Sequence, residues 1–345
     1  MSRVALPAAL LLFGLIAWAP SGAQAQTMTY TKGQPVYPAY EGWRHGEDGG
    51  YILMYGYMND NWEETPLVPV GPQNYFTPGP ADRGQPTLML PRRNRFIFEV
   101  PVPASFGQDD ELTWTLVVNG EEHSAYGTIR EDLFVDNVVI MSENGSLGAG
   151  TSSPEIRANI PPMVEVEGPL QRTVRVGEPL ELAVVVTDDG QPNRDSLRRR
   201  LEQAAAGDSV SLTEREAEEE AEEGAEEEEA EPTPQELLQR ALRAQTATVT
   251  VSKRVRLHYT WFVYRGDDEA VEISPPQVKP WEDTRAFANS PWSISWDPPE
   301  IPEDGRWTAE AVFSEPGTYV LHGRADDGGL YSDVELTVTV VPPVL

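Results

Sequence analysis

The chain has 345 residues, and its 56 acidic residues against 26 Lys and Arg give a formal net charge of −30. This balance argues against a nucleic-acid partner, because a phosphate-binding surface needs clustered positive charge. The chain has no cysteine, which excludes disulfides, a thiolate nucleophile and Cys-ligated zinc.

The N-terminus has the pattern of a secretory signal peptide. Arg3 supplies a basic start, residues 4–19 form an apolar run, and Ala23-Gln24-Ala25 is an Ala-x-Ala cleavage site. The alternative, an uncleaved anchor, needs a longer apolar run of ~20 residues. We therefore expect cleavage after Ala25 (signal peptide 1–25) and no transmembrane segment afterwards. The expected location is periplasmic or extracellular, in a bacterium.

Residues 26–142 predict a first β-sandwich domain. Residues 27–50 are rich in Tyr, Pro and Gly without a clear period, and they indicate an extended leading segment. Short strand-like runs follow, and Asn119-Gly120 predicts a two-residue hairpin turn between two alternating runs. The β-branched run at 134–141 predicts a further strand.

A linker is expected at 143–162, because this stretch is rich in Gly and Ser and ends in two prolines. The second domain is expected at 163–345, with a Glu-rich insertion at 191–246. Crowded like charges and few apolar residues predict that this acidic low-complexity insertion is disordered or partly helical.

The second domain carries a family resemblance on both sides of this insertion. The residues are Val176-Gly-Glu-Pro-Leu-Glu-Leu182 with Asp188-Asp-Gly190, then Trp261-Phe-Val263, then Ser314-Glu-Pro-Gly-Thr-Tyr-Val-Leu321 with Ala325-Asp-Asp-Gly328. These phrases resemble bacterial surface immunoglobulin-like sandwiches of the PKD and cadherin-like type, over residues 163–190 and 250–343. The N-terminal part resembles exported bacterial proteins of unassigned function, through Gly56-Tyr-Met-Asn-Asp-Asn-Trp-Glu-Glu64. The resemblance and the strand pattern predict an all-β chain of two immunoglobulin-like antiparallel β-sandwich domains.

An aromatic loop before the last strands contains the candidate contact residues. These are Trp281, Arg285, Asn289, Trp292 and Trp296. Indole faces stack on sugar rings and on protein partners, while Arg and Asn side chains can hydrogen-bond hydroxyl groups. The loop predicts an interface or a glycan site. The alternative is that its indoles only fix the loop onto the sandwich.

Two acidic turns are candidate calcium ligands. They contain Asp188, Asp189, Asp326 and Asp327. Calcium takes six to eight oxygen ligands, and the resemblance to cadherin-like modules implies that such turns could supply them. The alternative is ordinary Asp-Gly turn chemistry. No other cofactor is predicted.

No catalytic arrangement is visible in the sequence. The four histidines are isolated, and neither a Gly-x-Ser-x-Gly nor a Ser-x-x-Lys motif occurs. We therefore expect an exported, non-catalytic accessory subunit that makes protein–protein contacts on the periplasmic or outer face of an envelope complex. One alternative is a glycan-binding module that uses the 281–296 loop. A weaker alternative is a hydrolase whose site only the fold would assemble.

Overall fold

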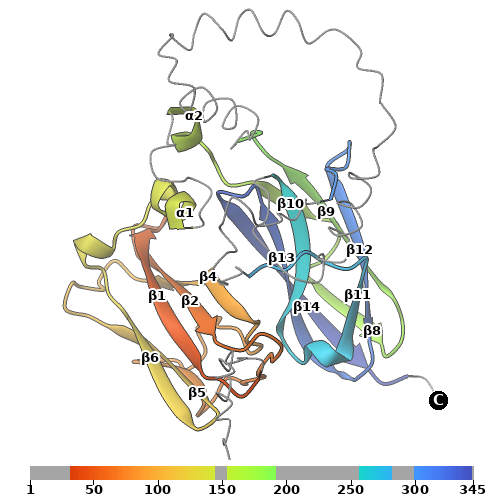
Figure 1. Ribbon diagram of the computed structural model, residues 1–345, viewed down its shortest axis with the longest axis horizontal. Coiled ribbons are helices and arrows are strands. Elements are labelled where there is room, and N and C mark those ends of the chain that lie inside the picture. The colour runs from red at the N-terminus through yellow and green to blue at the C-terminus, as the bar shows by residue number, and fades with distance from the viewer. Residues whose placement is uncertain (1–31, 144–153, 192–255, 282–298, 344–345) are drawn as a thin grey trace, which may run out of the picture.

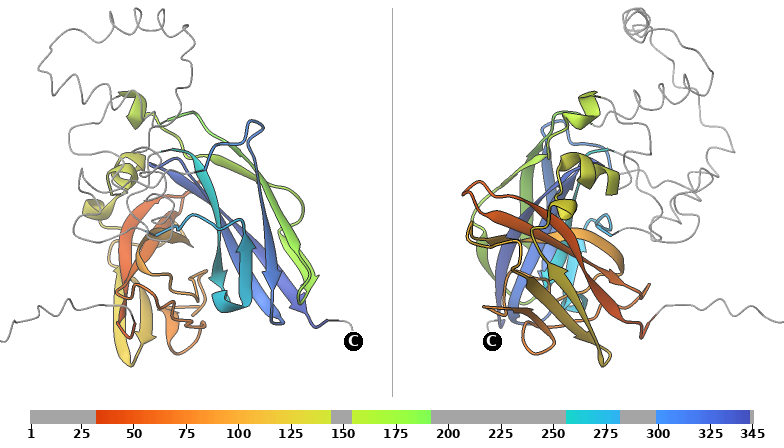
Figure 2. Two further views of the ribbon diagram at one scale, coloured as in Figure 1. Left: turned by 45° about the vertical axis from the view of Figure 1, so that its right-hand side comes forward. Right: turned by 90° about the vertical axis from the view of Figure 1, so that its left-hand side faces the viewer.

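The computed structural model describes residues 32–143, 154–191, 256–281 and 299–343. Within these ranges the strands form two β-sandwiches that lie side by side (Figures 1 and 2). This architecture confirms the all-β prediction. The expected signal peptide, nearly all of the acidic insertion and most of the aromatic loop lie outside the described residues. None of the helices in the described ranges is long and apolar enough to cross a membrane.

The first sandwich has two three-stranded antiparallel sheets. One contains β1 (Val36–His45), β2 (Tyr51–Asn59) and β4 (Arg92–Val102), and the other contains β3 (Asn74–Thr77), β5 (Leu112–Val118) and β6 (Glu121–Gly127). Their facing sides bury Tyr55, Phe76, Phe98 and Trp114, whose ring centroids lie 5.0–6.2 Å apart. Such aromatic clusters bury much apolar area per residue, so a chain without disulfides can stabilise this domain through its core.

The predicted hairpin at Asn119-Gly120 is confirmed. Val118 pairs with Glu121, and the two residues between them have φ values of 52° and 81°. Both central residues of a type I′ turn need positive φ, which Asn and Gly adopt most easily.

The predicted strand at 134–141 is wrong. A short 3-10 helix η1 (Glu131–Leu133) precedes α1 (Asn137–Glu143), whose Ile140 and Met141 are buried. The Asp136 side chain accepts a hydrogen bond from the Val139 backbone N–H at 2.9 Å, which caps the helix. This cap and the burial of the apolar face outweigh the strand preference of the β-branched residues.

The segment 27–50 also differs from its prediction, because most of its second half is β1. The register of β1 on β2 shifts between Tyr40 and Gly42. A β-bulge inserts one residue and so reverses which side chains face the core. The alternation that would reveal a strand is therefore broken in the sequence.

The second sandwich has two four-stranded sheets. Their strand orders are β7-β9-β12-β11 and β8-β14-β13-β10. The first sheet contains β7 (Met163–Val166), β9 (Leu180–Thr187), β12 (Arg306–Phe313) and β11 (Val271–Ser274), and the second contains β8 (Gln171–Arg175), β14 (Tyr331–Val341), β13 (Gly317–Asp326) and β10 (His258–Arg265). A 3-10 helix η3 (Asp268–Ala270) precedes β11. All neighbours pair antiparallel except β8 and β14, which are parallel.

This strand order is that of an immunoglobulin-like sandwich. In chain order, one sheet matches strands A, B, E and D and the other contains C, F and G. Trp261 on the C strand β10 is 2% exposed, and the Tyr319 hydroxyl on the F strand β13 donates to the Glu315 carbonyl oxygen at 3.1 Å. A buried C-strand Trp and such a tyrosine corner are marks of this fold. The prediction of an immunoglobulin-like second sandwich is therefore confirmed.

The two sandwiches share a polar contact along β10. Arg265 donates two hydrogen bonds to the Asp82 carboxylate, at 2.7 and 3.0 Å. The backbone N–H groups of Thr87 and Leu88 both donate to the Tyr264 carbonyl oxygen. The first sandwich is thus hydrogen-bonded to the backbone of the second.

A second contact lies at the end of the molecule where both α1 and α2 (Pro154–Arg157) are found (Figures 1 and 2). Here Met54, Phe96 and Met141 from the N-terminal side form one buried cluster with Leu330. Burial of apolar surface is the main favourable contribution to association, so this cluster stabilises the pairing of the two sandwiches.

Candidate functional site

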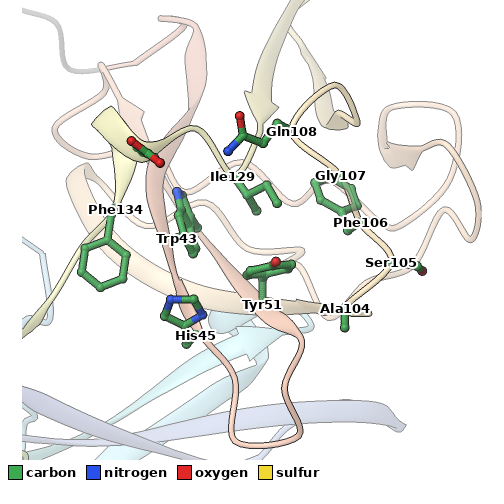
Figure 3. Close-up of a pocket in the computed structure, with 11 residues that line it drawn as sticks. Trp43, His45, Tyr51, Ala104, Ser105, Phe106, Gly107, Gln108, Ile129 and Phe134 are labelled. Carbon is green, nitrogen blue, oxygen red and sulfur yellow. The ribbon is translucent and has the colours of Figure 1, made fainter.

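The first sandwich has a solvent-open pocket with a volume of about 700 Å³ (Figure 3). Ligand pockets of proteins commonly have volumes in this range. Five rings line it, those of Trp43, His45, Tyr51, Phe106 and Phe134. The polar lining side chains include Gln108 and Glu131. We call this site the aromatic pocket.

Trp43 lies at the centre of the ring arrangement. Its centroid is 5.2 Å from that of Phe134, 5.3 Å from that of His45 and 5.4 Å from that of Tyr51. The interplanar angles are 72°, 83° and 83° in the same order. Trp43 therefore meets its three neighbours at steep angles, which is a favourable edge-to-face geometry, whereas His45 is tilted by 40° from Tyr51 and by 50° from Phe134. Trp43 is only 7% exposed, whereas Phe134 is 44% exposed.

The backbone holds one wall of the aromatic pocket in place. The Trp43 Nε1–H donates to the Arg130 carbonyl oxygen at 2.7 Å, and the Val135 N–H donates to the Trp43 carbonyl oxygen at 2.9 Å. Gly42 makes this approach feasible, because its φ is 124° and a Cβ atom there would overlap Val135 and the Leu133 carbonyl oxygen. The segment that carries Glu131 and Phe134 is thus fixed against β1.

The opposite wall is the loop between β4 and β5. The Phe106 N–H donates to the Pro103 carbonyl oxygen at 2.9 Å, and the Gly107 N–H donates to the Asp110 carboxylate at 2.7 Å. These local hydrogen bonds hold the loop in a compact turn. At its base Gly50 lies so close to the Val102 carbonyl oxygen that a Cβ atom would be 2.5 Å from it. Both walls are therefore formed by the chain itself before any ligand binds.

The aromatic pocket has an acidic character. Glu131 contributes a carboxylate to its lining, and the lining contains neither Lys nor Arg. Asp109 and Asp110 directly follow the lining residue Gln108, and all three are exposed. Asp132, which follows Glu131, is paired with Arg130 at 2.9 Å. The charge around the opening is thus predominantly negative.

The residues that the sequence singled out lie elsewhere. Trp281 is partly buried and packs against the main core, with Lys279 Nζ 5.2 Å from its ring centroid. The other four residues of that prediction, Arg285, Asn289, Trp292 and Trp296, lie outside the described residues. The interface or glycan role of this loop therefore stays a prediction.

The four aspartates proposed for calcium all accept hydrogen bonds from turn backbone. Asp188 accepts from the Gly190 N–H, Asp189 from the N–H groups of Ile160 and Gln191, Asp326 from the Gly328 N–H, and Asp327 from the N–H groups of Gly329 and Leu330. In the described part of the chain, no group of three or more His, Asp or Glu residues is arranged to hold a metal ion. Calcium binding stays a prediction. Calorimetric titration of calcium into the wild type and into Asp326→Asn checks it, because only the wild type should bind if this turn supplies ligands.

Asp327 is the most deeply buried of these carboxylates, at 1% exposure. Burial raises its pKa to about 7, although hydrogen bonds from Leu330, Gly329 and Asn159 oppose this change. The Asn159 amide, which donates at 3.1 Å, belongs to the segment between the sandwiches. Asp327 therefore ties this segment to the turn after β13.

The sequence analysis missed the aromatic pocket entirely. One signal was present, because Trp43 and His45 are two residues apart and so share one face of a strand. The remaining rings come from Tyr51, from the acidic loop with Phe106 and from the segment with Phe134. Only the fold brings these separate segments together.

No protein family and no curated protein matches the sequence. Among solved structures, domains 4 and 5 of the S-layer protein SbsC align over 89% of this chain and 98% of that one, with 9% identity and a TM-score of 0.21. Titin domains z1z2 in complex with telethonin align over 91% and 100%, with 8% identity and a TM-score of 0.22. Three N-terminal domains of the bacteriophage RB49 outer capsid protein Hoc align over 88% and 58%, with 8% identity and a TM-score of 0.17. Scores this low carry no inference, so the fold assignment rests on the strand order and the tyrosine corner.

Proposed function

We propose that this protein is an exported, non-catalytic binding protein, an accessory subunit that contacts other proteins on the periplasmic or outer face of a cell-envelope assembly. The observation that carries the proposal is the aromatic pocket, which is preformed, open to solvent and placed on the strands and turns of a sandwich. Aromatic side chains are enriched where proteins bind one another, because they bury large areas at little cost in side-chain entropy. Export is supported by the N-terminal signal pattern.

Two histidines outside the aromatic pocket are engaged in structural contacts. His322 is 3% exposed, its Nε2 lies 2.9 Å from the Glu335 carboxylate, and its ring stacks on Tyr264 at 3.6 Å. His123 lies at the surface near Glu121, and its ring packs on Tyr37. Glu335, Tyr264, Glu121 and Tyr37 are structural neighbours of these two histidines. A general base must instead lie within hydrogen-bond reach of a reacting group.

Affinity purification with matched variants tests the proposal. The tagged wild type, Phe134→Ala and Tyr126→Ala would be purified from native cells in mild detergent, and bound proteins would be quantified by mass spectrometry. Phe134 is in the aromatic pocket at 44% exposure, whereas Tyr126 on β6 is outside it at 58% exposure. Both substitutions remove an exposed ring, so both variants should fold.

We expect a stoichiometric partner with the wild type and with Tyr126→Ala, and a recovery reduced by about fivefold or more with Phe134→Ala. Loss of a well-placed aromatic contact costs more than about 1 kcal/mol, which corresponds to this change. Recovery of the wild type without any partner, or equal recovery with both variants, would contradict the proposal. Sugar-dependent quenching of Trp fluorescence would support the alternative, the glycan-binding module of the 281–296 loop.

A further inference from the structure

The ring geometry of the aromatic pocket favours a small ligand group over a sugar ring. A sugar ring stacks best on a broad, exposed indole face, but Trp43 is 7% exposed. The accessible surfaces belong instead to His45, Tyr51 and Phe134, which surround Trp43 on more than one side (Figure 3). Among these accessible rings, His45 meets Tyr51 at 40° and Phe134 at 50°. A small group on their solvent side can contact more than one π system, which is how proteins bind ammonium and guanidinium groups.

The charges around the aromatic pocket select a cation. Glu131 is an exposed carboxylate of the lining, and no Lys or Arg side chain lines the pocket to oppose it. A cation at this position would interact with a carboxylate and with aromatic faces together. Both interactions favour positive charge, and the formal net charge of −30 for the whole chain adds to the attraction.

The source of the cation follows from the extent of the acidic surface. Asp109, Asp110 and Glu111 are all exposed and continue along the loop beyond the pocket. A single small cation would use only the pocket, whereas a peptide segment with several basic residues would also reach this loop. The pocket volume of about 700 Å³ likewise exceeds the size of one guanidinium group and leaves room for neighbouring peptide.

We propose that the aromatic pocket binds a lysine or arginine side chain from a basic segment of the partner protein. The inference rests on the proposed function, because it names the group that the partner inserts. In this arrangement the guanidinium or ammonium group lies on the solvent side of the ring cluster, against His45 and a neighbouring ring, with Glu131 as its counter-charge. The acidic loop at 109–111 attracts the remaining basic residues of the segment.

Two peptides that differ only in charge test the ligand class. The probe is an acetylated and amidated peptide of alternating Gly and Arg, and the control peptide has citrulline in place of each Arg. Binding to the mature protein would be measured by calorimetry at 0.15 M salt, where exposed charges more than about 8 Å apart are largely screened. We expect the Arg peptide to bind at least about fivefold more tightly, since citrulline keeps the shape and loses the charge.

Matched variants locate the binding site. Glu131→Gln and Phe134→Ala should each weaken binding of the Arg peptide by about two- to fivefold, the range for one exposed ion pair or cation–π contact. Glu122→Gln and Tyr126→Ala remove the same kinds of group from β6, outside the pocket, and should leave affinity unchanged.

Two outcomes would overturn the inference. Equal binding of the Arg and citrulline peptides would exclude a cation-selective site. Equal effects of Glu131→Gln and Glu122→Gln would show diffuse attraction to an acidic protein. If purification nevertheless recovers a partner that Phe134→Ala loses, the proposed function stands and only the cationic ligand is wrong. If the peptide binds as expected and cells yield no partner, the cation-selective pocket stands, and the proposed function fails together with the protein source of the cation.

Discussion

Arg324→Met is the sharpest perturbation of the contact between the two sandwiches. Arg324 on β13 is 5% exposed, and its Nε and Nη2 atoms donate to the two Asp333 carboxylate oxygens at 2.7 Å each. Its Nη2 also lies 3.4 Å from the Phe96 carbonyl oxygen of the first sandwich. The guanidinium carbon lies 4.2 Å from the Tyr331 ring centroid. One side chain thus joins a buried ion pair, an aromatic ring and the neighbouring domain.

The expected loss of stability follows from what the substitution leaves behind. Breaking a buried ion pair costs about 3–5 kcal/mol, because the remaining charge stays buried without a partner. The Asp333 side chain is 20% exposed and can reach water, which favours the lower end of this range. We therefore expect a free energy of unfolding lower by about 3 kcal/mol, and a Tm lower by about 6–12 °C for a chain of this size.

Arg306→Met is the matched control. Arg306 makes comparable hydrogen bonds to Glu167 at 2.8 and 2.9 Å, but its side chain is 37% exposed. Arg306 also donates to Glu181 at 3.0 Å. Exposed pairs such as these are solvated and screened by salt, so this variant should lose clearly less Tm than Arg324→Met. Calorimetry on both variants checks the difference. Equal losses of Tm would refute the reasoning from burial.

Three further perturbations test other parts of the structure. Gly42→Ala should lower the free energy of unfolding by more than about 2 kcal/mol, because φ is 124° and a Cβ atom would overlap Val135. Gly33 also has a positive φ, of 78°, but open space around it, so Gly33→Ala should cost only about 1 kcal/mol; urea titrations measure both. Burial raises the pKa of Asp327 to about 7 in the folded state, above about 3.9 in the unfolded chain. The contribution of this group to the free energy of unfolding is therefore present at low pH and is lost as pH rises from about 4 to 7. Asp327→Asn should flatten that part of a Tm-against-pH profile, and an unchanged profile would contradict the assignment. Deletion of residues 207–232 should leave Tm unchanged in a thermal melt, because the Glu-rich sequence has little apolar surface to bury; a large loss would mean that the tract packs on the fold.

The sequence predicted best where local signals agree with the tertiary structure. The run at 173–187 combines β-branched residues with a Gly-containing turn, and it forms β8 and β9. Asn119-Gly120 supplied both positive-φ residues of its turn. Here propensity, turn chemistry and burial all favour the same structure, so residue patterns were sufficient.

The sequence failed where a tertiary contact decides the local structure. The register shift between Tyr40 and Gly42 lies where the segment with Val135 packs on β1, and the sequence does not alternate there. The Val138-Val139 pair favoured a strand, although Asp136 caps a helix at this position. The aromatic pocket was invisible for the same reason, because its rings come from three separate stretches of chain.

The hydrogen bonds between residues 84–88 and β10 have a consequence for the independence of the two sandwiches. β10 is the outermost strand of its sheet, and Tyr264 receives the N–H groups of Thr87 and Leu88 while its hydroxyl donates to Gly84. Open sheet edges are templates for pairing with other chains, and natural proteins cover them. Residues 84–88 therefore cover the end of this edge at Tyr264 and Arg265. A fragment cut within the connecting segment 143–162 would lack this cover, so we expect the isolated second sandwich to self-associate more readily than the whole chain.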